Sequence, residues 1–264
     1  MYFNSVPFLV FLPTVFVIYW FILKNNLRFQ NILLLISSYI FYGWWDYRFL
    51  LLIAASTLID YYVGIGIDKS RKTGTKKSLL ILSLIFNLGV LAYFKYFNFF
   101  IQTWISSWEQ LGINMDVNTM KIILPVGISF YTFQTLSYTI DVYRYNLKPT
   151  RNFVQFATYV SFFPQLVAGP IERASRLLPQ FKSKRVFNFE NSREGLHLIL
   201  WGLFQKVVIA DSCAIYVNNI FQNSGELNAL SLFLGAFYFS FQIYGDFAGY
   251  SNMAIGTGQS HLNL

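Results

Sequence analysis

The sequence predicts an all-α, polytopic membrane protein with about seven transmembrane helices and one re-entrant or interfacial segment near residues 152–170. Composition is the first reason: 55% of the 264 residues are hydrophobic, 12% are charged, and the mean hydropathy is +0.44. Soluble domains are roughly 45–50% apolar and about 25% charged. The other two reasons are apolar stretches of spanning length and an alternating distribution of basic residues. We expect residues 1–264 to form a single membrane domain.

Seven apolar stretches are each near or above the roughly 17–25 residues with which a helix crosses a bilayer. In chain order they cover residues 6–23, 29–45, 49–67, 78–105, 122–143, 195–217 and 227–256. No sequence repeat of fixed period, low-complexity linker or soluble domain separates them. The chain therefore reads as one helical membrane unit.

The basic residues explain the net charge of +8 and set the orientation. Most of them lie in four clusters, within residues 24–28, 69–77, 144–151 and 173–193, whereas residues 106–120 and 222–228 contain acids but no Lys or Arg. The positive-inside rule then predicts cytoplasmic clusters and an extracytoplasmic N-terminus in a multi-pass protein of the inner (plasma) membrane. The charge needs no nucleic acid as a partner.

The segment 152–170 has basic residues on both sides, so both of its ends are expected in the cytoplasm. Pro164, Gly169 and Pro170 interrupt any long helix there. A re-entrant or interfacial hairpin fits these two observations, and an eighth full crossing is the alternative.

The stretch 124–144, LPVGISFYTFQTLSYTIDVYR, combines spanning length with a polar stripe. At about 100° per residue, Gly127, Tyr131, Gln134, Tyr138 and Asp141 fall within one arc of a helix. A carboxylate at membrane depth costs roughly 2.5–3.5 kcal/mol on insertion scales, so the stripe is expected to face other helices or a wet cavity. This helix is a candidate wall of a functional site. Alternatively, its polar groups only bond neighbouring helices.

The stretch 162–181, FFPQLVAGPIERASRLLPQF, places backbone breakers beside polar and charged residues. The polar and charged members are Gln165, Glu172, Arg173 and Arg176. Broken backbone at membrane depth persists only where protein or a water-filled cavity satisfies it. The alternative is an ordinary interfacial loop whose charges lie in water.

Two further stretches carry ionisable residues. In 201–211, WGLFQKVVIAD, Lys206 and Asp211 are expected to form an interfacial ion pair. In 241–256, FQIYGDFAGYSNMAIG, Gln242, Asp246 and Tyr250 share one helix face, and Asp246 is the acid we most expect to be functional. The spacing of Gly245 and Gly249 also favours close helix packing, and a packing role alone is the alternative. The candidate tunnel or substrate-site residues are Gln134, Tyr138, Asp141, Gln165, Glu172, Arg173, Gln242, Asp246 and Tyr250.

Histidine and cysteine give no catalytic or metal assignment. His197 is expected at the membrane interface, and His261 lies near the C-terminus, where chains fray. Cys213 lies in an apolar segment and is interpreted as a packing residue, so no disulfide framework and no metal-ligand spacing is present.

In this order, the four stretches resemble the membrane-bound O-acyltransferases. The resemblance is to the bacterial branch that acetylates alginate and other exported polysaccharides and includes the D-alanine transfer protein of teichoic acid modification. The N-terminal segments SSYIFYGWWDYRFLLLI and STLIDYYVG are also similar to the family. The resemblance therefore covers nearly the whole chain, to about Gly258.

The resemblance implies transfer of an acyl group, with acetyl the leading expectation, from a cytoplasmic thioester donor to a hydroxyl of an extracytoplasmic glycan. Acetyl-CoA or another acyl thioester is the implied donor, no bound cofactor is implied, and partner proteins of a polysaccharide acetylation system are compatible with it. The family's presumed catalytic histidine lies in a Trp-Arg-Arg-Trp-His-like stretch further downstream, beyond Leu264. The catalytic residue is therefore unassigned, the chain is expected to be the N-terminal part of a longer acyltransferase, and its own activity is left open.

Two other functions fit the residues without the resemblance. A transporter of a small polar substrate would also carry intramembrane acids such as Asp60, Asp141 and Asp246, although no inverted repeat is visible. A non-catalytic membrane scaffold for glycan synthesis would fit the missing histidine.

Overall fold

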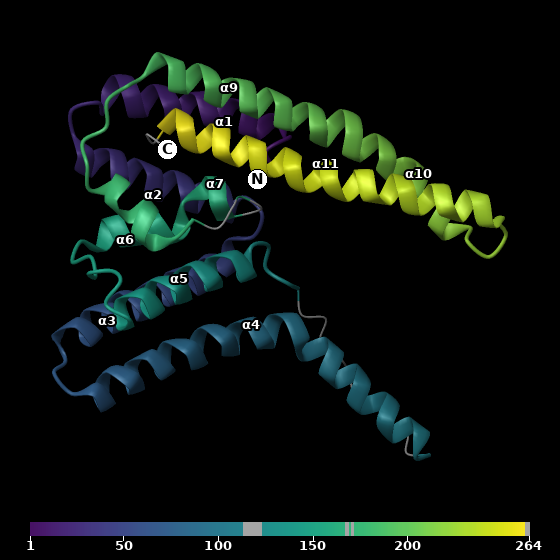
Figure 1. The fold of residues 1–264 in the computed structure, drawn as a ribbon, viewed down its shortest axis with the longest axis horizontal. Helices are drawn as coiled ribbons and strands as arrows, with labels where there is room; N and C mark the ends of the chain where they lie inside the picture. Colours follow the sequence, from purple (N-terminus) through teal and green to yellow (C-terminus); the bar gives the residue numbers. More distant parts are fainter. Residues whose placement is uncertain (113–122, 167–168, 170–171, 262–264) are drawn as a thin grey trace. The chain divides into compact units, whose positions relative to one another are not determined.

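The computed structural model describes residues 1–112, 123–166, 169 and 172–261, and every regular element in this part is helical (Figure 1). The all-α class is confirmed. The chain divides into two compact units. Unit 1 comprises Met1–Tyr47, Ser161–Ile171 and Pro179–Leu264, and unit 2 comprises Arg48–Val160 and Glu172–Leu178.

Unit 1 is built around a long pair of helical rods. One rod is α9 (Phe189–Phe204), the π-helical segment η4 (Gln205–Ala210) and α10 (Asp211–Gln222), and the other is α11 (Ala229–His261). Figure 1 shows the two rods side by side, joined by a short loop. The remaining elements of this unit are α1 (Val6–Val17), π-helical η1 (Ile18–Ile22), α2 (Leu27–Gly43), α7 (Phe163–Leu166) and, from its second residue on, η3 (Leu178–Phe181).

Glycines set the close approach of the two rods. A Cβ on Gly249 would lie 2.8 Å from the carbonyl oxygen of Gly202 and 3.0 Å from the backbone nitrogen of Lys206. A Cβ on Gly245 would lie 3.0 Å from the carbonyl oxygen of Gln205. Since a Cβ essentially never comes under 3.0 Å of backbone, these glycines permit the contact. The close packing expected from the spacing of Gly245 and Gly249 is confirmed.

Unit 2 centres on three mutually packed helices. They are α3 (Leu50–Lys69), α4 (Thr73–Gln110) and α5 (Ile128–Tyr143). The shorter elements are η2 (Tyr47–Phe49), whose first residue belongs to unit 1, α6 (Phe153–Ser161), whose last residue does, and α8 (Ala174–Leu177). Helix α5 starts later than the predicted span 122–143, because Gly127 at its N-cap is left-handed with φ of 76°. Residue 122 itself lies outside the described residues.

Helices coincide with all seven predicted spans. Within the described residues, three helical stretches are long and apolar enough to cross a membrane: Tyr47–Lys69, Thr73–Gln110 and Phe189–Gln222. Val6–Ile22 is a shorter apolar helical stretch. Membrane character is therefore supported, and the count of about seven crossings stays a prediction.

The segment 152–170 contains two short helices, α6 with nine residues and α7 with four. At 1.5 Å of rise per residue, neither is long enough to cross a bilayer. Phe156, Tyr159 and Phe163 are fully buried. The short helices agree with an interrupted segment, and its return to the cytoplasm stays a prediction. Pro170 lies outside the described residues.

Candidate functional site

An ion cluster forms in unit 1 where the stretches 201–211 and 241–256 meet. The ammonium of Lys206 donates to Oδ1 of Asp211 at 2.7 Å and to Oδ1 of Asp246 at 2.5 Å. Lys206 lies in η4, and Asp246 lies on the facing helix α11. The expected pair with Asp211 is present, and Asp246 is a second partner that the sequence patterns did not connect to Lys206.

Polar side chains extend this cluster along the two rods. The Lys206 ammonium lies 5.6 Å from the ring centroid of Tyr250, within the range of a cation–π contact. Asn252 donates from Nδ2 to Oε1 of the buried Gln205 at 2.7 Å. The buried Oε1 of Gln242 has no hydrogen-bond partner among the described residues. Gln242, Asp246 and Tyr250 thus line one polar stripe of α11.

The placement of these charges distinguishes the cluster from a surface ion pair. Lys206 lies midway along the 34-residue apolar stretch Phe189–Gln222, and only 14% of its side chain is exposed. Asp246 and Asp211 remain 35% and 46% exposed within the described chain. One lysine and two carboxylates give this cluster a formal charge of −1. At membrane depth, such carboxylates face water or further protein rather than lipid.

The chemistry available here is orientation and charge stabilisation. The Asp246 carboxylate accepts a hydrogen bond from Lys206, and the oxygens of a carboxylate act as hydrogen-bond acceptors. Such a group can position a hydroxyl or stabilise a neighbouring cation. A general base for acyl transfer is not identified among these residues.

The polar stripe of α5 lies in unit 2, and its amide is used within the fold. Gln134 donates from Nε2 to the carbonyl oxygen of Tyr159 at 2.7 Å, and the Tyr159 hydroxyl donates back to the carbonyl oxygen of Gln134 at 3.1 Å. Tyr138 is fully buried, with its ring 4.6 Å from that of Phe156. Asp141 is half-buried at the C-terminal end of the helix. Gln134 therefore links α5 to α6.

The candidate residues of the stretch 162–181 are divided between the two units. Gln165 is buried in α7 of unit 1. Glu172 and Arg173 lie in unit 2, where Oε2 of Glu172 is 3.8 Å from Nε of Arg176. Arg173 is exposed at the N-cap of α8. Arg176 is exposed and Glu172 is half-buried, so the two form a loose ion pair of the kind that contributes little to stability.

Asp60 lies in a hydrogen-bonded cluster that joins the three long helices of unit 2. Its carboxylate accepts hydrogen bonds from Ser83, from Nδ2 of Asn87 at 2.9 Å and from Oγ1 of Thr139 at 3.1 Å. Asp60 is fully buried. Three donors from α4 and α5 converge on one acid of α3, which is the arrangement of a structural clasp.

Two residues differ from their predicted surroundings. Arg185 belongs to a basic cluster expected in water, yet it is only 4% exposed. His261 was expected at a fraying terminus, yet it is fully buried at the end of α11, with Nδ1 2.9 Å from the carbonyl oxygen of Thr257. In both cases packing against α1 and its neighbours buries a residue that sequence position alone assigns to solvent. Phe16, for example, lies 5.8 Å from the His261 ring.

No group of three or more His, Cys, Asp or Glu side chains that could hold a metal ion occurs among the described residues. Cys213 is a free, half-buried thiol.

Comparison with known proteins places these features in a family context. No family model matches the chain. The chain is 41% identical over 262 residues to the probable alginate O-acetylase AlgI of Pseudomonas aeruginosa, which covers 98% of this chain and 49% of that protein. It is 40% identical over 260 residues to the protein of the same name from Azotobacter vinelandii, covering 98% of this chain and 51% of the relative.

A relative named for a different acceptor also matches. The chain is 35% identical over 286 residues to the peptidoglycan O-acetyltransferase of Helicobacter pylori, covering 97% of this chain and 53% of that protein. The chain spans about half the length of the curated relatives it matches. Over nearly its whole length it is thus homologous to polysaccharide O-acetyltransferases, which confirms the resemblance to the membrane-bound O-acyltransferases inferred from its four motifs.

Proposed function

We propose that this chain forms the N-terminal part of a membrane-bound O-acyltransferase that modifies a cell-envelope polysaccharide. The enzyme moves an acyl group, acetyl in the leading case, from a cytoplasmic thioester donor such as acetyl-CoA to a hydroxyl of an extracytoplasmic glycan. The observation that carries this proposal is the match, over 97–98% of the chain, to relatives named as O-acetylases of alginate or O-acetyltransferases of peptidoglycan. Alginate and peptidoglycan are therefore the acceptors to test first.

The ion cluster supports a role for unit 1 in that reaction. Lys206 lies in the stretch 201–211 and Asp246 in the stretch 241–256, 40 residues further along the chain. Nζ of Lys206 lies 2.5 Å from Oδ1 of Asp246. Placing a largely buried lysine between two acids on apolar helices is energetically costly, so such a cluster is expected where it is functional or strongly structural. We assign Asp246, with Tyr250 and Gln242 on the same face, to positioning the acceptor hydroxyl. The base that removes its proton is assigned to a residue outside this chain.

The proposed topology follows from the charge distribution. The protein is placed in the inner (plasma) membrane with about seven crossings and an extracytoplasmic N-terminus. In this orientation the basic loops face the donor, and the connector at residues 223–228 faces the glycan. Acyl transfer between the two sides then requires a path through the helices.

Gene deletion and complementation test the proposed function. Loss of the gene should remove ester-linked acetyl groups from the surface polysaccharide, measured by mild alkaline release and quantification of acetate. Complementation with the native gene should restore them, whereas Asp246→Asn should leave at least tenfold fewer. Glu226→Gln, which neutralises an exposed acid in a connector, is the matched control and should restore native levels. Unchanged acetate release after deletion would refute the proposal.

A further inference from the structure

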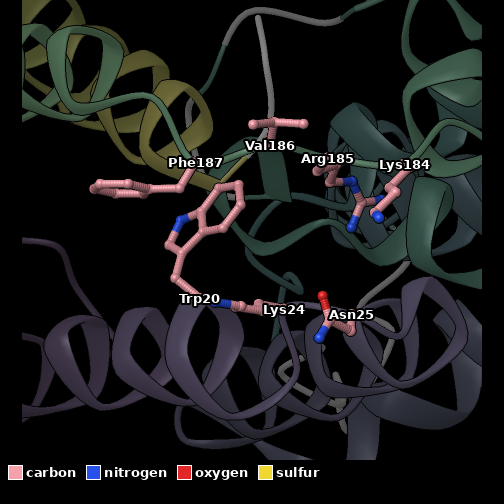
Figure 2. Close-up of a pocket in the computed structure, with 7 residues that line it drawn as sticks. All are labelled: Trp20, Lys24, Asn25, Lys184, Arg185, Val186 and Phe187. Atoms are coloured by element: carbon pink, nitrogen blue, oxygen red, sulfur yellow. The ribbon is translucent and has the colours of Figure 1, made fainter.

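A basic pocket lies in unit 1, apart from the ion cluster, where the end of η1 meets the segment that precedes α9 (Figure 2). Its volume is about 300 Å³. The lining residues are Trp20, Lys24, Asn25, Lys184, Arg185, Val186 and Phe187. Among the described residues, three cationic side chains and one amide thus line this pocket, and no carboxylate does.

Arg185 is held in place by neutral groups. It donates from Nη1 to the Tyr19 hydroxyl at 2.5 Å, from Nη2 to Oδ1 of Asn31 at 2.7 Å and from Nε to the carbonyl oxygen of Gln180 at 3.2 Å. Burial lowers the pKa of Arg185, but a guanidinium stays charged in proteins. No acid of the described residues forms an ion pair with it. A buried positive charge without a counter-charge is unfavourable, so an anion bound beside it would relieve that cost.

Aromatic contacts fix the walls of this pocket. Trp20 donates from Nε1 to the carbonyl oxygen of Ser260 at 2.8 Å, and its ring lies 5.4 Å from that of Phe187. The Arg185 guanidinium lies 5.3 Å from the ring centroid of Phe181. In Figure 2 Lys184 and Arg185 lie side by side, with Lys24 and Asn25 across the pocket from them. Side chains locked in this way are preorganised for a ligand.

We propose that this pocket binds a phosphate group. A pre-positioned guanidinium with two ammonium groups and an amide donor is a set that recognises phosphate oxygens. The described lining residues include no acid, which favours an anion over a cation. The phosphate belongs either to a soluble phosphate-bearing metabolite or to the headgroup of an anionic phospholipid. The inference does not depend on acyl transfer, and its test measures binding alone.

The first experiment titrates inorganic pyrophosphate into the full chain, purified in dodecyl maltoside micelles, which carry no phosphate. Isothermal titration calorimetry should show saturable binding, and Lys24→Gln or Lys184→Gln should each weaken it at least tenfold. Arg28→Gln and Lys182→Gln are matched controls, because each removes one exposed charge a few residues away without lining the pocket. The controls should stay within twofold of the native affinity. Arg185 is left intact because its hydrogen bonds also hold the fold.

The second experiment distinguishes the two sources. Native mass spectrometry of protein extracted from phosphatidylglycerol-containing nanodiscs should show retained lipid in the native chain if a headgroup occupies this pocket. That lipid should be lost in Lys24→Gln and Lys184→Gln but kept in Arg28→Gln and Lys182→Gln. Saturable pyrophosphate binding without retained lipid assigns the site to a soluble phosphate. The proposal would be overturned if the native chain showed neither pyrophosphate binding nor lipid retention. It would also be overturned if both were equal in the native chain and all four variants.

Discussion

At the scale of single residues, Lys206 is the centre of the ion cluster in unit 1. It is the shared partner of two carboxylates, one on its own rod and one on α11. Removing a partner from such a cluster leaves charge uncompensated in a poorly solvated place, which costs about 3–5 kcal/mol where burial is complete. The partial exposure of both acids reduces that figure here.

Substituting Lys206 tests the cluster's contribution to stability. Lys206→Met should lower the thermal unfolding midpoint of the detergent-purified chain, because Asp211 and Asp246 then repel each other without a cation. Lys206→Arg keeps the charge and should retain most of the stability. Equal unfolding midpoints for Lys206→Met and the native chain, measured by intrinsic fluorescence, would contradict the assigned role.

Asp60 gives a second prediction at this scale. Asp60→Ala leaves the donors of Ser83, Asn87 and Thr139 without their shared acceptor, so the free energy of unfolding should fall by about 1–3 kcal/mol. Asp68→Ala, at an exposed position of the same helix, should change it by less than about 0.5 kcal/mol. Denaturant titration of both variants in micelles measures the difference. If Asp68→Ala lowered the free energy of unfolding as much as Asp60→Ala, the hydrogen bonds to Asp60 would not be a specific source of stability.

The members of the ion cluster and the pair Lys206–Asp211 could be predicted from the sequence, but the pairing of Lys206 with Asp246 could not. A lysine and an acid inside apolar stretches each require a partner, which was the available signal. Helical periodicity places residues on the faces of one helix and does not give the register between two helices. The contact between Lys206 and Asp246 therefore follows from the packing of the two rods and could not be predicted from either stretch alone. The burial of Arg185 depends in the same way on Tyr19 and Asn31, which lie more than 150 positions away.

At the scale of elements, the contact between the two rods of unit 1 depends on glycines, which have no side chain to keep the helices apart. Gly249 and Gly202 allow α11 and α9 to approach until backbone meets backbone. The same contact places Asp246, one turn before Gly249, within reach of Lys206. The π-helical turn of η4 lies at this point, and such turns occur often at functional sites.

A matched pair of alanine substitutions tests that contact. Gly249→Ala introduces a Cβ that would lie 2.8 Å from backbone, so the rods must separate and the unfolding midpoint should fall. Gly89→Ala makes the same change in α4, where nothing lies within 4 Å, and should be neutral or stabilising by up to about 1 kcal/mol. Both variants are measured by thermal unfolding in micelles. A Gly249→Ala chain as stable as the Gly89→Ala chain would contradict the tight contact.

Most element positions followed from the sequence because apolar length and periodicity are local signals. The start of α5 at Ile128 did not, since the left-handed Gly127 that ends the preceding turn looks like one more apolar residue in a hydropathy window. The π-helical segments η1 and η4 are also invisible in such a window.

At the scale of the whole molecule, topology is the property on which the proposed direction of transfer rests. Cys213 is the only cysteine, so Cys213→Ser gives a background for single-cysteine labelling. A membrane-impermeant maleimide added to intact cells should label Ser224→Cys, in the acidic connector, and not Ser183→Cys, in a basic loop. Opening the cells should expose Ser183→Cys. The reverse pattern would invert the predicted orientation.

Transfer across the membrane is the central claim, and sided vesicles test it most directly. Inside-out membrane vesicles are prepared from cells with and without the gene, loaded with the acceptor polysaccharide and supplied outside with acetyl-labelled acetyl-CoA. The label should appear as alkali-labile ester on the enclosed polysaccharide only in vesicles from cells with the gene, and it should fall at least tenfold with Asp246→Asn. Equal labelling in vesicles from cells with and without the gene would contradict the account, provided that the protein is present and folded in the vesicles from cells with the gene.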